Sequence, residues 1–129
     1  MNLHTGMKLS LTDKVILENT AKTLGSGSLL VYGTPAMLLL VEKTAVALLS
    51  GNLDEGMTTV GTNLNVNHVS ASPVGCEVCC EVELTAIDRK KLTFHVTVKD
   101  PAGIIGEGTH ERFIVDSQRF QEKADCKFA

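Results

Sequence analysis

The sequence predicts an α+β domain in which a curved antiparallel sheet wraps around one long apolar helix. Thr34 followed by Pro35 marks a helix start, and the apolar run behind it ends at Gly51. Four segments that alternate apolar and polar residues follow, with no second helical pattern between them. The 129 residues are 43% hydrophobic, which is enough for the core of one domain spanning residues 1–129.

The segment before the helix has the weakest pattern. Residues 8–19 mix apolar and polar positions and predict a first strand, or a strand with a bend. Gly25 and Gly27 predict a flexible loop at residues 24–28.

The helix itself is expected from Pro35 to Ser50. Thr34 is expected to be its N-cap, because a threonine hydroxyl accepts hydrogen bonds from free amides and proline suits the first helical position. Gly51 and Asn52 supply a stop signal. The residues between leave almost no polar stripe, so the helix must be covered nearly all round.

Four strands are predicted after the helix, at residues 58–69, 76–87, 92–99 and 104–115. Alternation assigns each strand an inward face. That face comprises Val60, Leu64, Val66 and His68; Val78, Cys80, Val82, Leu84 and Ala86; and Leu92, Phe94, Val96 and Val98. Tight turns are expected at residues 88–90 and 100–103.

One buried helix followed by antiparallel strands is the outline of the hot-dog fold. A helix this apolar cannot be covered by one small sheet alone. Pairing of subunits would cover the excess apolar surface, so we expect a homodimer or a higher homo-oligomer.

Composition excludes several classes of function. A net charge of −3 at pH 7 gives no basic field for nucleic acid. No segment is apolar enough to predict a membrane span, and the N-terminus lacks the pattern of a secretory signal, so a cytoplasmic location is expected. Three of the four cysteines fall within five residues, and two of them, Cys76 and Cys80, share the apolar parity of the strand, which favours buried thiols over a metal site.

Three residues are candidates for catalysis. Glu42 interrupts the apolar helix, and it either lies buried, where its proton affinity can be adjusted, or lies wet at a subunit edge. His68 ends a strand on the inward parity and can reach a core-facing site, although a lone histidine there is more often structural. Thr34 is ordinarily a cap, but its hydroxyl can orient a carboxylate or face an oxyanion.

From Val31 to Phe120 the sequence resembles the hot-dog thioesterases of the fluoroacetyl-CoA thioesterase type. The matching landmarks are Thr34, Glu42, the pair Gly61-Thr62, the stretch His68, Ala71, Pro73 and Gly75, and the block Gly108-Thr109-His110-Glu111-Arg112.

The resemblance implies hydrolysis of a short or medium acyl-CoA thioester, with coenzyme A as part of the substrate and no separate cofactor. It implies that Glu42 is the nucleophile or general base, that His68 polarises water or assists proton transfer, and that Thr34 positions the carboxylate. It also implies substrate binding at Gly61 and Arg112. The inward parity of Arg112 with His110 and Ile114 leaves an ion pair and a ligand contact equally open.

One feature departs from the family pattern. The fluoroacetyl-specific enzyme carries an aromatic lid residue shortly before the threonine, where this chain has Gly27, Ser28 and Leu29. A more open or differently shaped acyl pocket is therefore expected. The alternative function is a non-catalytic module that binds acyl-CoA or another small ligand in the same pocket, whereas no histidine motif typical of a hydratase is found.

Overall fold

The computed structural model describes all residues from 1 to 129. Five strands, three α-helices and one short 3-10 helix follow one another along the chain. Their order is β1 (Lys8–Lys14), η1 (Leu17–Asn19), α1 (Ala21–Leu24), α2 (Thr34–Leu49), β2 (Met57–His68), β3 (Glu77–Asp88), β4 (Lys91–Asp100), β5 (Gly103–Asp116) and α3 (Ser117–Asp125).

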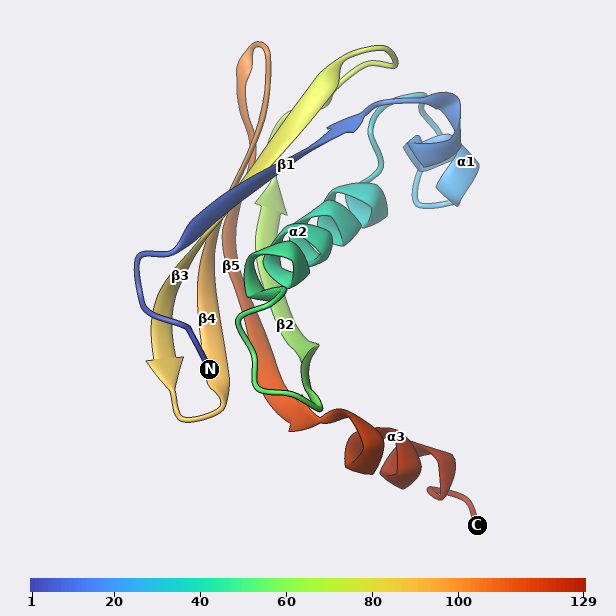
Figure 1. The fold of residues 1–129 in the computed structure, drawn as a ribbon. Coiled ribbons are helices and arrows are strands. Elements are labelled where there is room, and N and C mark those ends of the chain that lie inside the picture. The colour runs from blue at the N-terminus through green and yellow to red at the C-terminus, as the bar shows by residue number, and fades with distance from the viewer.

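The strands form a single antiparallel sheet in the order β1-β3-β4-β5-β2. Helix α2 lies against one face of this curved sheet, with α1 near its first turn (Figure 1). Helix α3 extends away from the sheet at the end of β5 and buries no residue. The architecture therefore has two layers, and the central helix and sheet match the predicted α+β arrangement.

The core lies between α2 and the middle of the sheet. The predicted inward residues of β3 and β4, apart from Ala86, are fully buried, because their side chains alternate toward the helix. They meet the buried side of α2, which includes Met37, Val41 and Ala45. Cys80 belongs to this core, and burial raises the pKa of its thiol to about 11. All four cysteines are free thiols.

Two bulges correct the predicted strand faces. The register of β2 against β5 shifts between Gly61 and Asn63, so Thr62 is an extra residue. Val60 consequently pairs with the outward-facing Phe113 instead of sharing the inward face of His68. A single extra residue reverses the side-chain parity of everything before it.

The second bulge lies in β3. Its register against β4 shifts between Leu84 and Ala86. Ala86 is exposed, and Ile87 takes the inward position opposite the buried Leu92. The prediction that Ala86 faces the core is therefore wrong, and the cause is again one inserted residue that simple alternation does not reveal.

The start of α2 differs from the prediction by one residue. Gly33 is the N-cap, with extended backbone angles, and Thr34 is already the first helical residue. No side chain caps this end of the helix, so the hydroxyl of Thr34 is available for another contact.

The single sheet leaves part of the surface of α2 uncovered, as the sequence predicted. Leu39 and Val46 are about half exposed, and Lys43 lies between them on the same side of the helix. One sheet covers one side of an apolar helix, and this stripe is what remains. No helix in the structure has the length and apolar character needed to cross a membrane.

The chain before α2 contains short helices, η1 and α1, where the sequence predicted only a strand and a loop. Tyr32 fixes the end of this segment. Its buried hydroxyl donates a hydrogen bond to Asp13 Oδ2 at 2.8 Å, which ties the approach to α2 to strand β1. Burial, followed by this contact, raises the pKa of Tyr32.

Candidate active site

The first cluster of the site joins the start of α2 to the end of β2. Thr34 Oγ1 and His68 Nδ1 share a hydrogen bond of 2.8 Å. The register of β2 after its bulge turns Leu64, Val66 and His68 to the helix side, as predicted for these three residues. Sequence reasoning therefore placed the threonine and the histidine correctly relative to each other.

The ring of His68 is available for chemistry on its other side. Its Nε2 is buried and has no hydrogen-bond partner in the protein. Burial lowers the pKa of His68, against a smaller opposing effect of the Ser70 backbone. A neutral imidazole with one free nitrogen is a proton acceptor or donor, according to its tautomer.

A cavity of about 290 Å³ adjoins this pair. Thr34 and His68 line it together with small side chains from α1, from the loop after α1 and from the loop after β2, including Ala21, Ser26 and Ala71. Ser26 belongs to the predicted flexible loop at residues 24–28 and directly precedes the segment where the aromatic lid was expected to be missing. No aromatic ring other than Tyr32 and His68 lines this cavity.

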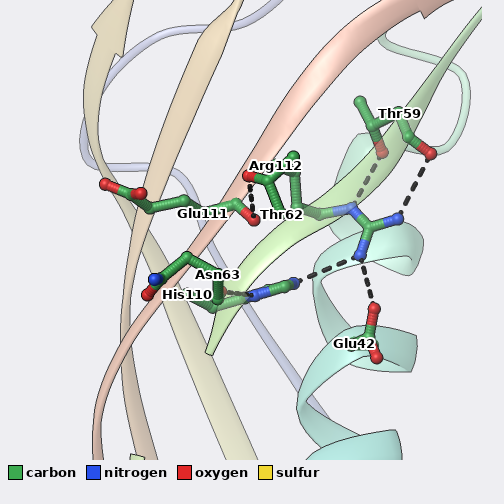
Figure 2. A network of polar contacts seen from close by, with 7 residues as sticks. All are labelled: Glu42, Thr59, Thr62, Asn63, His110, Glu111 and Arg112. Atoms are coloured by element: carbon green, nitrogen blue, oxygen red, sulfur yellow. Dashed lines mark hydrogen bonds and ion pairs between the residues drawn. The ribbon is translucent and has the colours of Figure 1, made fainter. Parts of the chain in front are cut away.

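The second cluster lies farther along α2 (Figure 2). Arg112 Nη1 donates a hydrogen bond to Glu42 Oε2 at 3.2 Å, and the two side chains form an ion pair. The arginine side chain is 6% exposed, whereas that of Glu42 is 39% exposed. Of the two interpretations of Arg112, the inward ion pair is present in the structure, and a ligand contact through Arg112 stays a prediction.

Gly61 makes room for the ion pair. A Cβ atom on Gly61 would lie 2.5 Å from Glu42 Oε2 and 3.1 Å from Arg112 Nη1. Any larger residue would therefore displace the carboxylate or the guanidinium. The structure gives Gly61 this spatial role, and its contact with substrate stays a prediction.

The side chain of Glu42 is partly exposed in the single chain. The interpretation of a deeply buried carboxylate is wrong for the single chain, because Glu42 lies at the border of the exposed stripe of α2. Eight residues of helix separate it from Thr34, which is about 12 Å along the axis. One chain therefore brings Thr34 and His68 together but does not bring Glu42 to them.

Three polar residues complete the second cluster and were missed as functional residues. Thr59 and His110 contact the guanidinium of Arg112, and the backbone oxygen of Asn63 contacts the other side of the His110 ring (Figure 2). The available signal was the inward parity that His110 shares with Arg112, two residues farther along β5. No group of three or more metal-ligating side chains is placed to hold a metal ion.

Comparison with known proteins gives consistent matches. The model of the family described as fluoroacetyl-CoA-specific thioesterase matches residues 15–118. A fluoroacetyl-CoA thioesterase of Streptantibioticus cattleyicolor is 32% identical over 97 residues, which cover 75% of this chain and 70% of that protein.

Solved structures agree over the whole chain. A fluoroacetyl-CoA thioesterase superposes with a TM-score of 0.92 at 26% identity, with 100% of both chains covered. A threonine-to-serine variant of such an enzyme, in complex with acetyl-CoA, has a TM-score of 0.90 at 26% identity and covers 98% of this chain and 100% of its own. A hot-dog-like protein from Thermanaerovibrio acidaminovorans has a TM-score of 0.90 at 24% identity, covering 97% and 93%. These superpositions confirm the predicted hot-dog fold.

Proposed function

We propose, because the chain belongs to the fluoroacetyl-CoA-specific thioesterase family, that it hydrolyses an acyl-coenzyme A thioester. The family match carries this proposal, since its range, residues 15–118, contains both clusters of the candidate site. Coenzyme A takes part as the leaving group of the substrate, and the proposed reaction needs only water in addition. Four free thiols fit a reducing compartment, which supports a cytoplasmic enzyme.

The proposed chemistry assigns a role to each candidate residue. Glu42 attacks the thioester carbonyl, directly or through a water molecule that it deprotonates. His68 assists proton transfer with its free Nε2, and Thr34 holds the imidazole through the bond to Nδ1. Gly61 and Arg112 contact the substrate beside the carboxylate, which is the position that their distances to Glu42 support.

Because the two clusters are separated along one chain, the proposal includes a homodimer. The exposed stripe of Leu39, Lys43 and Val46 supplies an apolar surface that a second copy can cover. Two α2 helices can pack antiparallel so that their closest contact lies halfway between Thr34 and Glu42. Thr34 of one subunit then lies opposite Glu42 of the partner subunit. Each active site would then combine Thr34 and His68 of one subunit with Glu42 of the other.

The acyl group is proposed to be short or medium in length. The cavity beside Thr34 and His68 has about 290 Å³ and is lined mostly by small side chains. Such a lining selects by volume and makes few specific polar contacts, so discrimination between neighbouring chain lengths should be modest.

The test is a panel of acyl-CoA thioesters from two to twelve or so carbons, assayed for release of free coenzyme A thiol. The parent should turn over at least one member, and Glu42→Gln should lower kcat by about 100-fold or more, since general bases contribute that much. Glu107→Gln is the matched control, because this glutamate lies exposed on the other face of β5. Thermal stabilisation by acyl-CoA without any thiol release would refute hydrolysis and support the non-catalytic binding module.

A further inference from the structure

Among the ionisable residues around Glu42, His110 is the most deeply buried. Its side chain is 0% exposed, and its ring stacks on Phe94 with a centroid distance of 6.1 Å and an interplanar angle of 27°. The two residues are cross-strand partners on the inner face of the sheet. The ring therefore cannot rotate freely, and each nitrogen has a fixed neighbour.

Those neighbours determine the tautomer of the ring. Nδ1 lies 2.8 Å from the backbone oxygen of Asn63, and a carbonyl oxygen can only accept. Nδ1 must therefore carry the proton. Nε2, which lies 3.2 Å from Arg112 Nη1, then presents a lone pair and accepts a hydrogen bond from the guanidinium. A protonated ring would direct a second N–H at the arginine.

Four of the five N–H groups of the Arg112 guanidinium have an acceptor in the protein. Nε donates to Thr59 Oγ1 at 2.9 Å, and Nη2 donates to Thr59 O at 3.2 Å. Nη1 divides its two N–H groups between His110 Nε2 and Glu42 Oε2. All but one of these acceptors are neutral, so the positive charge of Arg112 is compensated only by Glu42.

We propose that His110 is a positioning residue for catalysis: its neutral Nδ1–H tautomer fixes Arg112, and Arg112 in turn holds the Glu42 carboxylate by Oε2 and leaves Oε1 free to react. This inference rests on the proposed thioesterase function for its effect on rate. The arrangement anchors a half-exposed carboxylate on α2 to a fully buried histidine of the sheet, so the reacting group is oriented by the rigid core.

The charges around the ring agree with a neutral histidine. Burial lowers the pKa of His110. The Asn63 backbone opposes this effect, the positive charge of Arg112 adds to it, and Glu42 and Glu111 oppose it more weakly.

Two substitutions distinguish the loss of the His110 hydrogen-bond acceptor from the loss of its side-chain volume. His110→Leu removes the acceptor, and His110→Gln keeps an amide oxygen that can accept from Arg112. We expect His110→Leu to lower kcat about 10-fold to 100-fold with KM changed less than about threefold, and His110→Gln to recover most of that loss. His95→Leu is the matched control, since His95 is exposed on the opposite face of neighbouring strand β4 and should keep the parent rate.

The proposal is overturned if folded His110→Leu keeps a kcat within about twofold of the parent. It is also overturned if the kcat of His110→Gln is no higher than that of His110→Leu. The tautomer of the parent protein is a second, independent measurement by two-bond ¹⁵N–¹H NMR correlation, and it decides the matter where a variant does not fold. A proton on Nε2 would overturn the proposal. If the parent lacks thioesterase activity, the proposed function fails, whereas the tautomer experiment still tests the contact between His110 and Arg112.

Discussion

Two inactive variants should restore each other when they share a dimer. We consider a Thr34→Ala chain co-expressed with a Glu42→Gln chain. Along α2 the two positions are about 12 Å apart, whereas groups that exchange a proton must approach to about 3 Å. In the proposed dimer, a carboxylate therefore serves the threonine of the partner subunit, and each proposed site draws on both subunits.

The expected magnitude follows from two-fold symmetry. In the mixed dimer, one site inherits both substitutions and the other inherits neither, so kcat per dimer should be about half that of the parent. Each uniform dimer carries one damaged group in both of its sites, and its kcat should be lower by about 100-fold or more.

The assay uses two different affinity tags, sequential purification of the mixed dimer and thiol release from the best substrate of the panel. The control pairs Thr34→Ala with His68→Ala. Because these side chains share a hydrogen bond within one chain at 2.8 Å, they belong to the same half-site and the mixed dimer has no intact site. It should stay inactive. The shared site would be refuted if the mixed Thr34→Ala/Glu42→Gln dimer were as inactive as the two uniform dimers. It would also be refuted if the unsubstituted protein were fully active while sedimentation showed a monomer.

Two further predictions concern the second cluster. Gly61→Ala would place a methyl group 2.5 Å from Glu42 Oε2, so kcat should fall by about 100-fold while thermal unfolding changes little; near-parent turnover would show that the gap is not needed. The free energy of unfolding should fall as the pH drops below 6.5, because burial lowers the pKa of His110 and of His68 in the folded chain. Below pH 6.5 the unfolded chain binds protons that the folded chain does not bind, and the loss ends where the pH reaches the lowered pKa values of the folded state. The free energy of unfolding of His110→Gln, measured by urea titration at several pH values in this range, should depend on pH less steeply than that of the parent, by the equivalent of about one proton. An unchanged pH dependence would contradict the neutral state of His110.

Much of the fold could be predicted because β3 and β4 are paired along most of their length and covered by one helix. The inward residues follow strict alternation from Val78 to Leu84 in β3 and from Leu92 to Val98 in β4, so pattern and structure agree there. Helix α3 was missed because it buries no residue and its sequence is polar, with Phe120 as its one large apolar side chain. The short helices before α2 are below the length at which periodicity can be recognised.

The candidate site could be predicted only in part, for a geometric reason. Thr34 and His68 each end or begin an element, and the sheet brings those ends together. The surroundings of Glu42 depend on Thr59 and His110, whose contacts arise from the pairing of β2 with β5. No local pattern in β2 or α2 specifies these long-range neighbours, and the proposed covering of α2 by a second copy would likewise depend on the assembly.

The bulge at Thr62 separates the two halves of strand β2 in sequence but not in facing. Gly61 pairs with Arg112 and Asn63 pairs with Glu111, so Thr62 is the one residue between them without a partner on β5. Deleting Thr62 would leave one continuous register in which Thr59 and Gly61 still face the helix. The candidate site is therefore expected to keep its geometry when this residue is lost.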